Sequence, residues 1–196
     1  MSNVLSLESL PEELLERILW FSVVAPPRPT VTRPVWHLAR QSSSTSRPVP
    51  SRLTPLLVNS TFYRIALPLY YHTIHLTTSY HSTCLRKLFL RNAFLSRCVR
   101  SLVVSCITSD THLAVRLCEE LTGLDVTLDP FIAPRLAEGF CETLGKLRRI
   151  TSFTLRKEHN MYLTMPTVRQ FVTQVARAIG FWPLLVRLLA SLGDKY

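Results

Sequence analysis

Short runs of β-branched and aromatic residues alternate with helical patterns along most of this chain, and this alternation constrains the fold most strongly. The runs occupy residues 69–76, 99–104, 124–128 and 150–155, and helical patterns cover residues 84–98, 113–121 and 136–147. A strand followed by a helix, repeated about every two dozen residues, is typical of a solenoid whose units stack into one core. We therefore predict an α/β fold with a short, irregular solenoid of strand–helix units and a parallel sheet.

A further unit is indicated near the end of the sequence, where residues 168–179 have a helical pattern and residues 182–186 are mostly apolar. We expect this last unit to be incomplete. The repeat domain would then cover residues 71–196, and about four or five units are few for such an array. The domain is therefore expected to be short or truncated.

Two apolar helical segments precede the repeats, in a module covering residues 1–70. In the first, Ser9 and Glu12 have capping-box spacing, and Pro11 fits the first turn. Leu14, Ile18 and Phe21 then recur at helical spacing, which predicts an amphipathic helix of roughly 10–14 residues. The second segment continues its apolar stripe to Ala66 and is expected to end before a proline at position 68.

A proline-rich segment, residues 25–52, separates the two helices. It contains six prolines, five serines, three threonines and five arginines, with no glycine and no acidic residue. Such a composition has little to bury and cannot sustain a regular hydrogen-bond ladder. We predict a disordered loop.

The charge and cysteine content restrict the environment and the partners. The formal net charge is +10, spread through the body of the chain, which favours acidic partners in general and nucleic acid among them. No stretch is long and apolar enough for a membrane span, and the acidic N-terminus does not resemble a secretory signal. We expect a cytoplasmic and/or nuclear protein with reduced, mostly buried thiols at its five cysteines, which are Cys84, Cys98, Cys106, Cys118 and Cys141.

No pattern of catalytic or metal-binding residues stands out. The sequence has no GxSxG, no glycine-rich phosphate loop and no HExxH. Glu119 and Glu120 are adjacent on a predicted helix, so they should diverge into solvent. The cluster of His72, His75, His81 and Cys84 has no common tetrahedral spacing. We therefore predict no catalytic residues, no metal and no cofactor.

The strongest group of basic residues flanks the run at 150–155, with Phe153 between its members. A solvated rim of the solenoid is the favoured interpretation, and binding of acidic or phosphorylated targets is an alternative. Nucleic-acid binding, which would require exposed aromatics beside the charges, is less favoured. The group consists of Lys146, Arg148, Arg149, Arg156 and Lys157.

Residues 10–19, with the pattern Leu-Pro-x-Glu-Leu-Leu-x-x-Ile-Leu, followed by residues 57–66, resemble the F-box. Val58 and Phe62 match the Val-x-x-x-aromatic part of its later helix, and residues 67–76 are similar to the segment that leads into leucine-rich-repeat-like units in many fungal F-box proteins. The resemblance departs from the family where about 28 residues interrupt the two blocks. A flexible loop of that length costs only modest closure entropy, so the helices are expected to assemble.

The resemblance implies a substrate-recognition subunit of an SCF-type cullin-RING ubiquitin ligase. Its helices would bind a Skp1-like adaptor, which links to the cullin complex, and its repeats would bind a protein target that the sequence does not identify. The subunit itself would not be an enzyme. The implied adaptor-binding residues are Leu10, Pro11, Leu14, Ile18, Leu57, Val58, Phe62 and Ile65.

Two alternatives remain open. The chain would be a repeat-type interaction protein without adaptor binding if the apolar faces of both N-terminal helices were fully buried. A basic nucleic-acid-binding module is the second alternative, and salt-sensitive binding would be its signature.

Overall fold

The computed structural model describes residues 7, 10–24, 52–128, 132–157 and 165–191. The chain divides into two compact units, Met1–Tyr70 and Tyr71–Tyr196, which are described separately. Most of the proline-rich segment, residues 25–51, lies outside the described residues, so its predicted disorder stays a prediction.

The first unit is a small helical module. It contains α1 (Glu12–Val23), the short 3-10 helix η3 (Thr54–Leu57) and α2 (Ser60–Tyr71). Its core forms where α1 packs on α2, and the half-buried Val24, Leu56 and Tyr70 pack around it. The buried residues of this core are Leu15, Leu19, Val23, Phe62, Ile65, Ala66 and Leu69.

The start of α1 differs from the predicted capping box. Pro11, in an extended conformation, occupies the N-cap position without a side-chain cap, and its carbonyl accepts hydrogen bonds from the backbone N–H groups of Leu14 and Leu15. The N-cap position belongs to Pro11, and Ser9, the predicted cap, lies outside the described residues. At α2 the cap comes from Asn59, whose Oδ1 accepts the backbone N–H of Phe62 at 2.8 Å.

The end of α2 also differs from the prediction. Pro68 lies inside the helix, which continues to Tyr71. A proline in a helix interior removes one backbone hydrogen bond, but burial of Ala66 and Leu69 on either side stabilises the continued helix. The predicted strand at 69–76 is therefore shortened to β1 (Thr73–Leu76).

The second unit is an α/β fold built of alternating strand–helix units, as predicted. Its five strands form one parallel sheet in chain order, from β1 through β2 (Ser101–Val104), β3 (Gly123–Thr127) and β4 (Ser152–Arg156) to β5 (Arg187–Ser191). β2, β3 and β4 coincide with predicted runs. β5 starts just after the apolar residues 182–186, so the last unit, which was expected to be incomplete, has a strand of its own.

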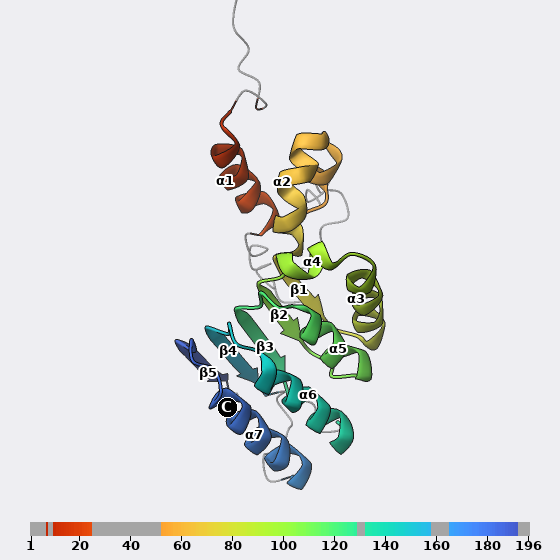
Figure 1. The fold of residues 1–196 in the computed structure, drawn as a ribbon, viewed down its shortest axis with the longest axis vertical. Helices are drawn as coiled ribbons and strands as arrows, with labels where there is room; N and C mark the ends of the chain where they lie inside the picture. The colour runs from red at the N-terminus through yellow and green to blue at the C-terminus, as the bar shows by residue number, and fades with distance from the viewer. Residues whose placement is uncertain (1–6, 8–9, 25–51, 129–131, 158–164, 192–196) are drawn as a thin grey trace, which may run out of the picture. The chain divides into compact units, whose positions relative to one another are not determined.

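The helices of this unit lie side by side along one face of the sheet (Figure 1). They are α3 (Ser79–Arg91), α4 (Ala93–Cys98), α5 (Ser109–Leu117), α6 (Pro134–Lys146) and α7 (Pro166–Ile179). The single helix predicted at 84–98 is two, because Asn92 leaves the helical conformation and its side chain accepts the N–H of Phe94.

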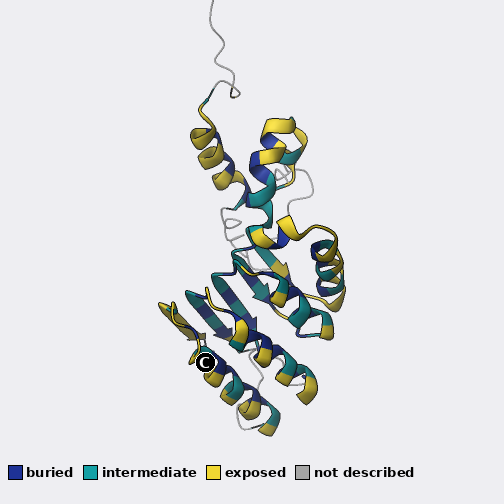
Figure 2. Ribbon diagram, in the orientation of Figure 1, coloured by how far each residue is buried: buried dark blue, intermediate teal, exposed yellow. Residues whose placement is uncertain are grey.

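The core of the second unit consists of rows of residues that run across the strands (Figure 2). One row is in register through Ile74, Leu102, Leu124, Phe153 and Leu188. Leu102, Leu124 and Phe153 are buried between the sheet and the helices, whereas Leu188 on β5 is exposed. The helix-facing core is therefore continuous through β4 and open at β5.

Candidate protein interface

Helix α1 has two apolar rows, and only one of them is used by the core. Leu15 and Leu19 face α2 and are each 3% exposed. Leu14, Ile18 and Phe21, the stripe predicted from helical spacing, are 49%, 46% and 66% exposed. A small surface helix usually has one apolar stripe and a polar opposite face. The second apolar row is thus left over after the unit has formed its own core.

A second group of exposed apolar residues follows on η3, which contacts α1. Leu57 is 84% exposed, and Val58, the residue that ends η3, is 56% exposed. Exposed apolar surface gathered within one small unit commonly marks a protein-binding site. We call the exposed residues Leu14, Ile18, Phe21, Leu57 and Val58 the apolar patch.

The structure divides the eight residues that the resemblance implied for adaptor binding. Pro11, Leu14, Ile18, Leu57 and Val58 are exposed, and Leu10 is half-buried. Phe62 and Ile65 are only 8% exposed and belong to the core. These two residues were expected to contact a partner. In this structure they instead hold α2 against α1 and do not face solvent.

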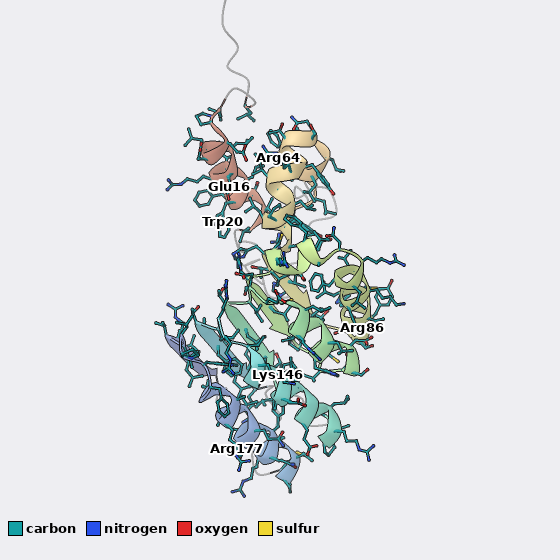
Figure 3. All side chains as sticks on the ribbon, in the orientation of Figure 1. Glu16, Trp20, Arg64, Arg86, Lys146 and Arg177 are labelled. Atoms are coloured by element: carbon teal, nitrogen blue, oxygen red, sulfur yellow. The ribbon has the colours of Figure 1, made fainter. Side chains whose placement is uncertain are left out.

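Phe21 and Trp20 extend the exposed surface beyond the residues implied by the resemblance. Phe21 was indicated by its helical spacing from Leu14 and Ile18. Trp20, labelled on α1 in Figure 3, is 37% exposed, and no periodic signal distinguished it.

An ion pair fixes α1 against α2. Both guanidinium Nη atoms of Arg64 donate to the carboxylate of Glu12, at 2.9 Å and 2.7 Å. The hydrogen bond from Arg64 lowers the pKa of Glu12, and the carboxylate raises the pKa of Arg64. Arg52 also donates from Nε to the carbonyl of Val23 at 2.5 Å. The end of α1 is therefore joined directly to the last residue of the proline-rich segment.

The predicted basic group is not one surface. Lys146, Arg148 and Arg149 precede β4, whereas Arg156 and Lys157 lie at its far end. Phe153, expected as an aromatic between the charges, is fully buried. The five residues therefore lie at opposite ends of β4 and do not form a continuous cationic site.

Three members of this group are also neutralised by carboxylates. Lys146 contacts Glu142 at 2.6 Å, Arg149 pairs with Glu120, and Arg156 holds both carboxylate oxygens of Asp125 at 2.5–2.8 Å. The Asp125 carboxylate raises the pKa of Arg156. Arg148 donates to the carbonyl of Phe181 at 3.3 Å. Most of these side chains therefore stabilise the stack of repeats.

Glu120 was expected to lie on a helix and to point into solvent, and the structure differs on both points. It lies in the turn after α5, not on a helix, and it is not simply solvated. Its carboxylate accepts from Arg100 at 2.7 Å and from Arg149. These hydrogen bonds, the one from Arg100 first, lower the pKa of Glu120.

The possible metal ligands and two of the cysteines can be located in the described parts of the chain. No group of three or more His, Cys, Asp or Glu residues there is placed to hold a metal ion. Burial raises the pKa of the Cys118 and Cys141 thiols to about 12, so both are protonated at neutral pH. No described helix has the length and apolar character needed to cross a membrane.

Comparison with known protein families, curated proteins and solved structures gave no match to this chain.

Proposed function

We propose that this chain is a substrate-recognition subunit of an SCF-type ubiquitin ligase, in which the apolar patch binds a Skp1-like adaptor and the repeat unit binds a target. The observation that supports the proposal is the second apolar row of α1. Leu14, Ile18 and Phe21 remain exposed although α1 already packs on α2 through Leu15 and Leu19.

The geometry fits a preformed docking surface. The α1–α2 core and the Glu12–Arg64 pair hold the exposed row in place before a partner arrives. A rigid surface loses little entropy on binding, which favours affinity. The subunit would act by proximity, because it would raise the concentration of the target near the ligase.

The alternatives have less support. An interaction module without adaptor binding was expected to bury the apolar faces of both helices, and the apolar patch is exposed. Nucleic-acid binding is disfavoured because Lys146, Arg149 and Arg156 already pair with carboxylates.

A titration of the purified chain with a purified Skp1 adaptor tests the proposal. We expect wild type to bind and Leu14→Ala/Ile18→Ala to bind about tenfold more weakly or worse, because truncation of central apolar anchors typically costs more than about 1.4 kcal/mol. Both residues are exposed, so the double variant should remain folded.

The matched control is Leu90→Ala/Phe94→Ala, which removes two exposed apolar side chains of the repeat unit. It should bind the adaptor like wild type. Absence of binding by wild type, or equal loss in both double variants, would contradict the proposal.

A further inference from the structure

Strand β5 leaves one edge of the sheet unpaired in the described part of the chain. It hydrogen-bonds to β4 alone, and the N–H of Arg187 donates to the carbonyl of Thr151 at 2.9 Å. Backbone groups of successive strand residues point to opposite sides. The N–H and C=O groups of Leu188 and Ala190 therefore face the open edge, where another strand can pair with them.

The open edge is also apolar. Leu188 continues the row of Leu124 and Phe153, which are 2% and 0% exposed, yet it is itself 56% exposed. Leu189 on the other face and Val186 just before the strand are exposed as well. Natural sheet edges are usually protected by charges, prolines or a covering element. Among the described residues, the core row ends at Leu188 on the exposed strand β5.

The described helix and strand at this edge, α7 and β5, carry basic but no acidic residues. Residues 165–191 contain three arginines, Arg169, Arg177 and Arg187, and no acidic residue. Arg177 and Arg187 have no carboxylate partner among the described residues, unlike Arg149 and Arg156. Figure 3 shows Arg177 on α7.

A groove of about 470 Å³ lies between α6 and α7, and Glu138 and Glu142 line it together with basic side chains. Arg148, Arg177 and Phe181 line it, and Phe181 belongs to the segment that connects α7 to β5. Arg148 is held there by its hydrogen bond to the Phe181 carbonyl. This groove is of mixed charge, so a partner at the β5 edge itself would meet the exposed Leu188 and Leu189 and the guanidinium group of Arg187.

We propose that the open edge of β5 binds an extended segment of a partner protein, which adds a sixth strand to the sheet. The segment would alternate apolar residues, which cover Leu188 and extend the core row, with Asp or Glu, which pair with Arg187 on the other face of the sheet. Addition of a strand to an exposed sheet edge is a recurrent mode of peptide recognition. A second copy of the chain fits less well, because it would bring the same arginines and no carboxylates to the edge.

This site lies in the repeat unit and does not require the apolar patch. The Leu14→Ala/Ile18→Ala variant should therefore retain it. Loss of adaptor binding and loss of segment binding are then separate outcomes.

Fluorescence anisotropy of the full chain with two sets of labelled seven-residue peptides tests the proposal. One set alternates Leu, Val or Phe with Asp or Glu, and the matched set carries Lys in place of the acidic residues. We expect the acidic set to bind and the Lys set to bind at least about tenfold more weakly. Arg187→Glu should weaken binding of the acidic set and strengthen binding of the Lys set.

The variant Ala190→Pro tests the backbone contact. The substitution removes the backbone N–H of residue 190, which faces the open edge, so the hydrogen bonds between β5 and β4 are kept. Edge strands tolerate proline at such positions. We expect about tenfold weaker peptide binding, because a backbone donor is lost. Ala190→Val, which keeps the N–H, should bind like wild type.

Sedimentation over a range of concentrations completes the test, and we expect a monomer. Binding by neither peptide set, equal binding of both, or equal affinity of the Pro and Val variants would overturn the proposal. A dimer that Ala190→Pro dissociates would overturn it as well, in favour of a second copy at the edge. If circular dichroism shows that Ala190→Pro is misfolded, the effect of Arg187→Glu on binding of the two peptide sets decides whether the proposal holds.

Discussion

Glu120 illustrates how single residues join neighbouring repeats in this chain. Its carboxylate lies just before β3, while Arg100 precedes β2 and Arg149 precedes β4. One acidic side chain therefore links three successive units at the same end of their strands. An ion pair between exposed groups contributes little by itself, but a shared carboxylate also separates two arginines that would otherwise repel each other.

The pH dependence of unfolding should report this link. Because its arginine partners lower the folded-state pKa of Glu120 below the ordinary value of 4.5, its stabilising contribution is present above that pH. The contribution is lost as the pH falls through the lowered value. We expect urea denaturation at pH 7 to give a lower free energy of unfolding for Glu120→Gln than for wild type. The difference between the two free energies should become smaller as the pH falls below 4.5.

Glu119→Gln is the matched control, since Glu119 is exposed and forms no ion pair in the described residues. Its unfolding midpoint should follow that of wild type at each pH. If Glu120→Gln were less stable than wild type by the same free energy at every pH down to 2, the proposed contribution of the Glu120 carboxylate would be contradicted.

At the scale of elements, α2 departs most from its sequence pattern. Pro68 lies within the helix and cannot donate a backbone hydrogen bond to the preceding turn. The residues around it nevertheless stay helical, because Ile65, Ala66 and Leu69 are buried against α1. Tertiary packing thus outweighs the local preference of proline.

Replacement of this proline should therefore increase stability. We expect Pro68→Ala to raise the free energy of unfolding by about 1–2 kcal/mol, the gain of a helical hydrogen bond less the greater entropy of the unfolded chain. Urea denaturation followed by circular dichroism measures the change. A destabilised variant would indicate that the packing of the ring matters more than the missing N–H.

At the scale of the whole repeat unit, stability depends on a core that no single strand–helix unit can form alone. Phe153 on β4 is fully buried and meets the ring of Trp182 edge to face, with centroids 5.3 Å apart. Trp182 in turn donates from Nε1 to the carbonyl of Leu144 on α6 at 2.8 Å. These contacts join the fourth strand, its preceding helix and the segment that leads into β5.

Removal of the Phe153 ring should destabilise the repeat unit as a whole. We expect Phe153→Ala to lower the free energy of unfolding by about 3–5 kcal/mol, because a large cavity opens in the shared core. Trp182 lies against the affected ring, so tryptophan fluorescence during urea unfolding can follow the loss. Phe94→Ala, which removes a 55% exposed ring, should change the midpoint little.

The local pattern alone determined the strand–helix alternation, the positions of β2, β3 and β4 and the parallel sheet. Those elements are set by the spacing of their own apolar residues, which neighbouring units repeat in register. Tertiary contacts decided the rest. Packing kept Pro68 inside α2 and separated Phe62 and Ile65 from the exposed Leu14 and Ile18. It also paired Arg149 and Arg156 with carboxylates of a neighbouring strand–helix unit. Helical spacing marks a residue as apolar and periodic, but which of two apolar rows meets the core depends on the element that packs beside it.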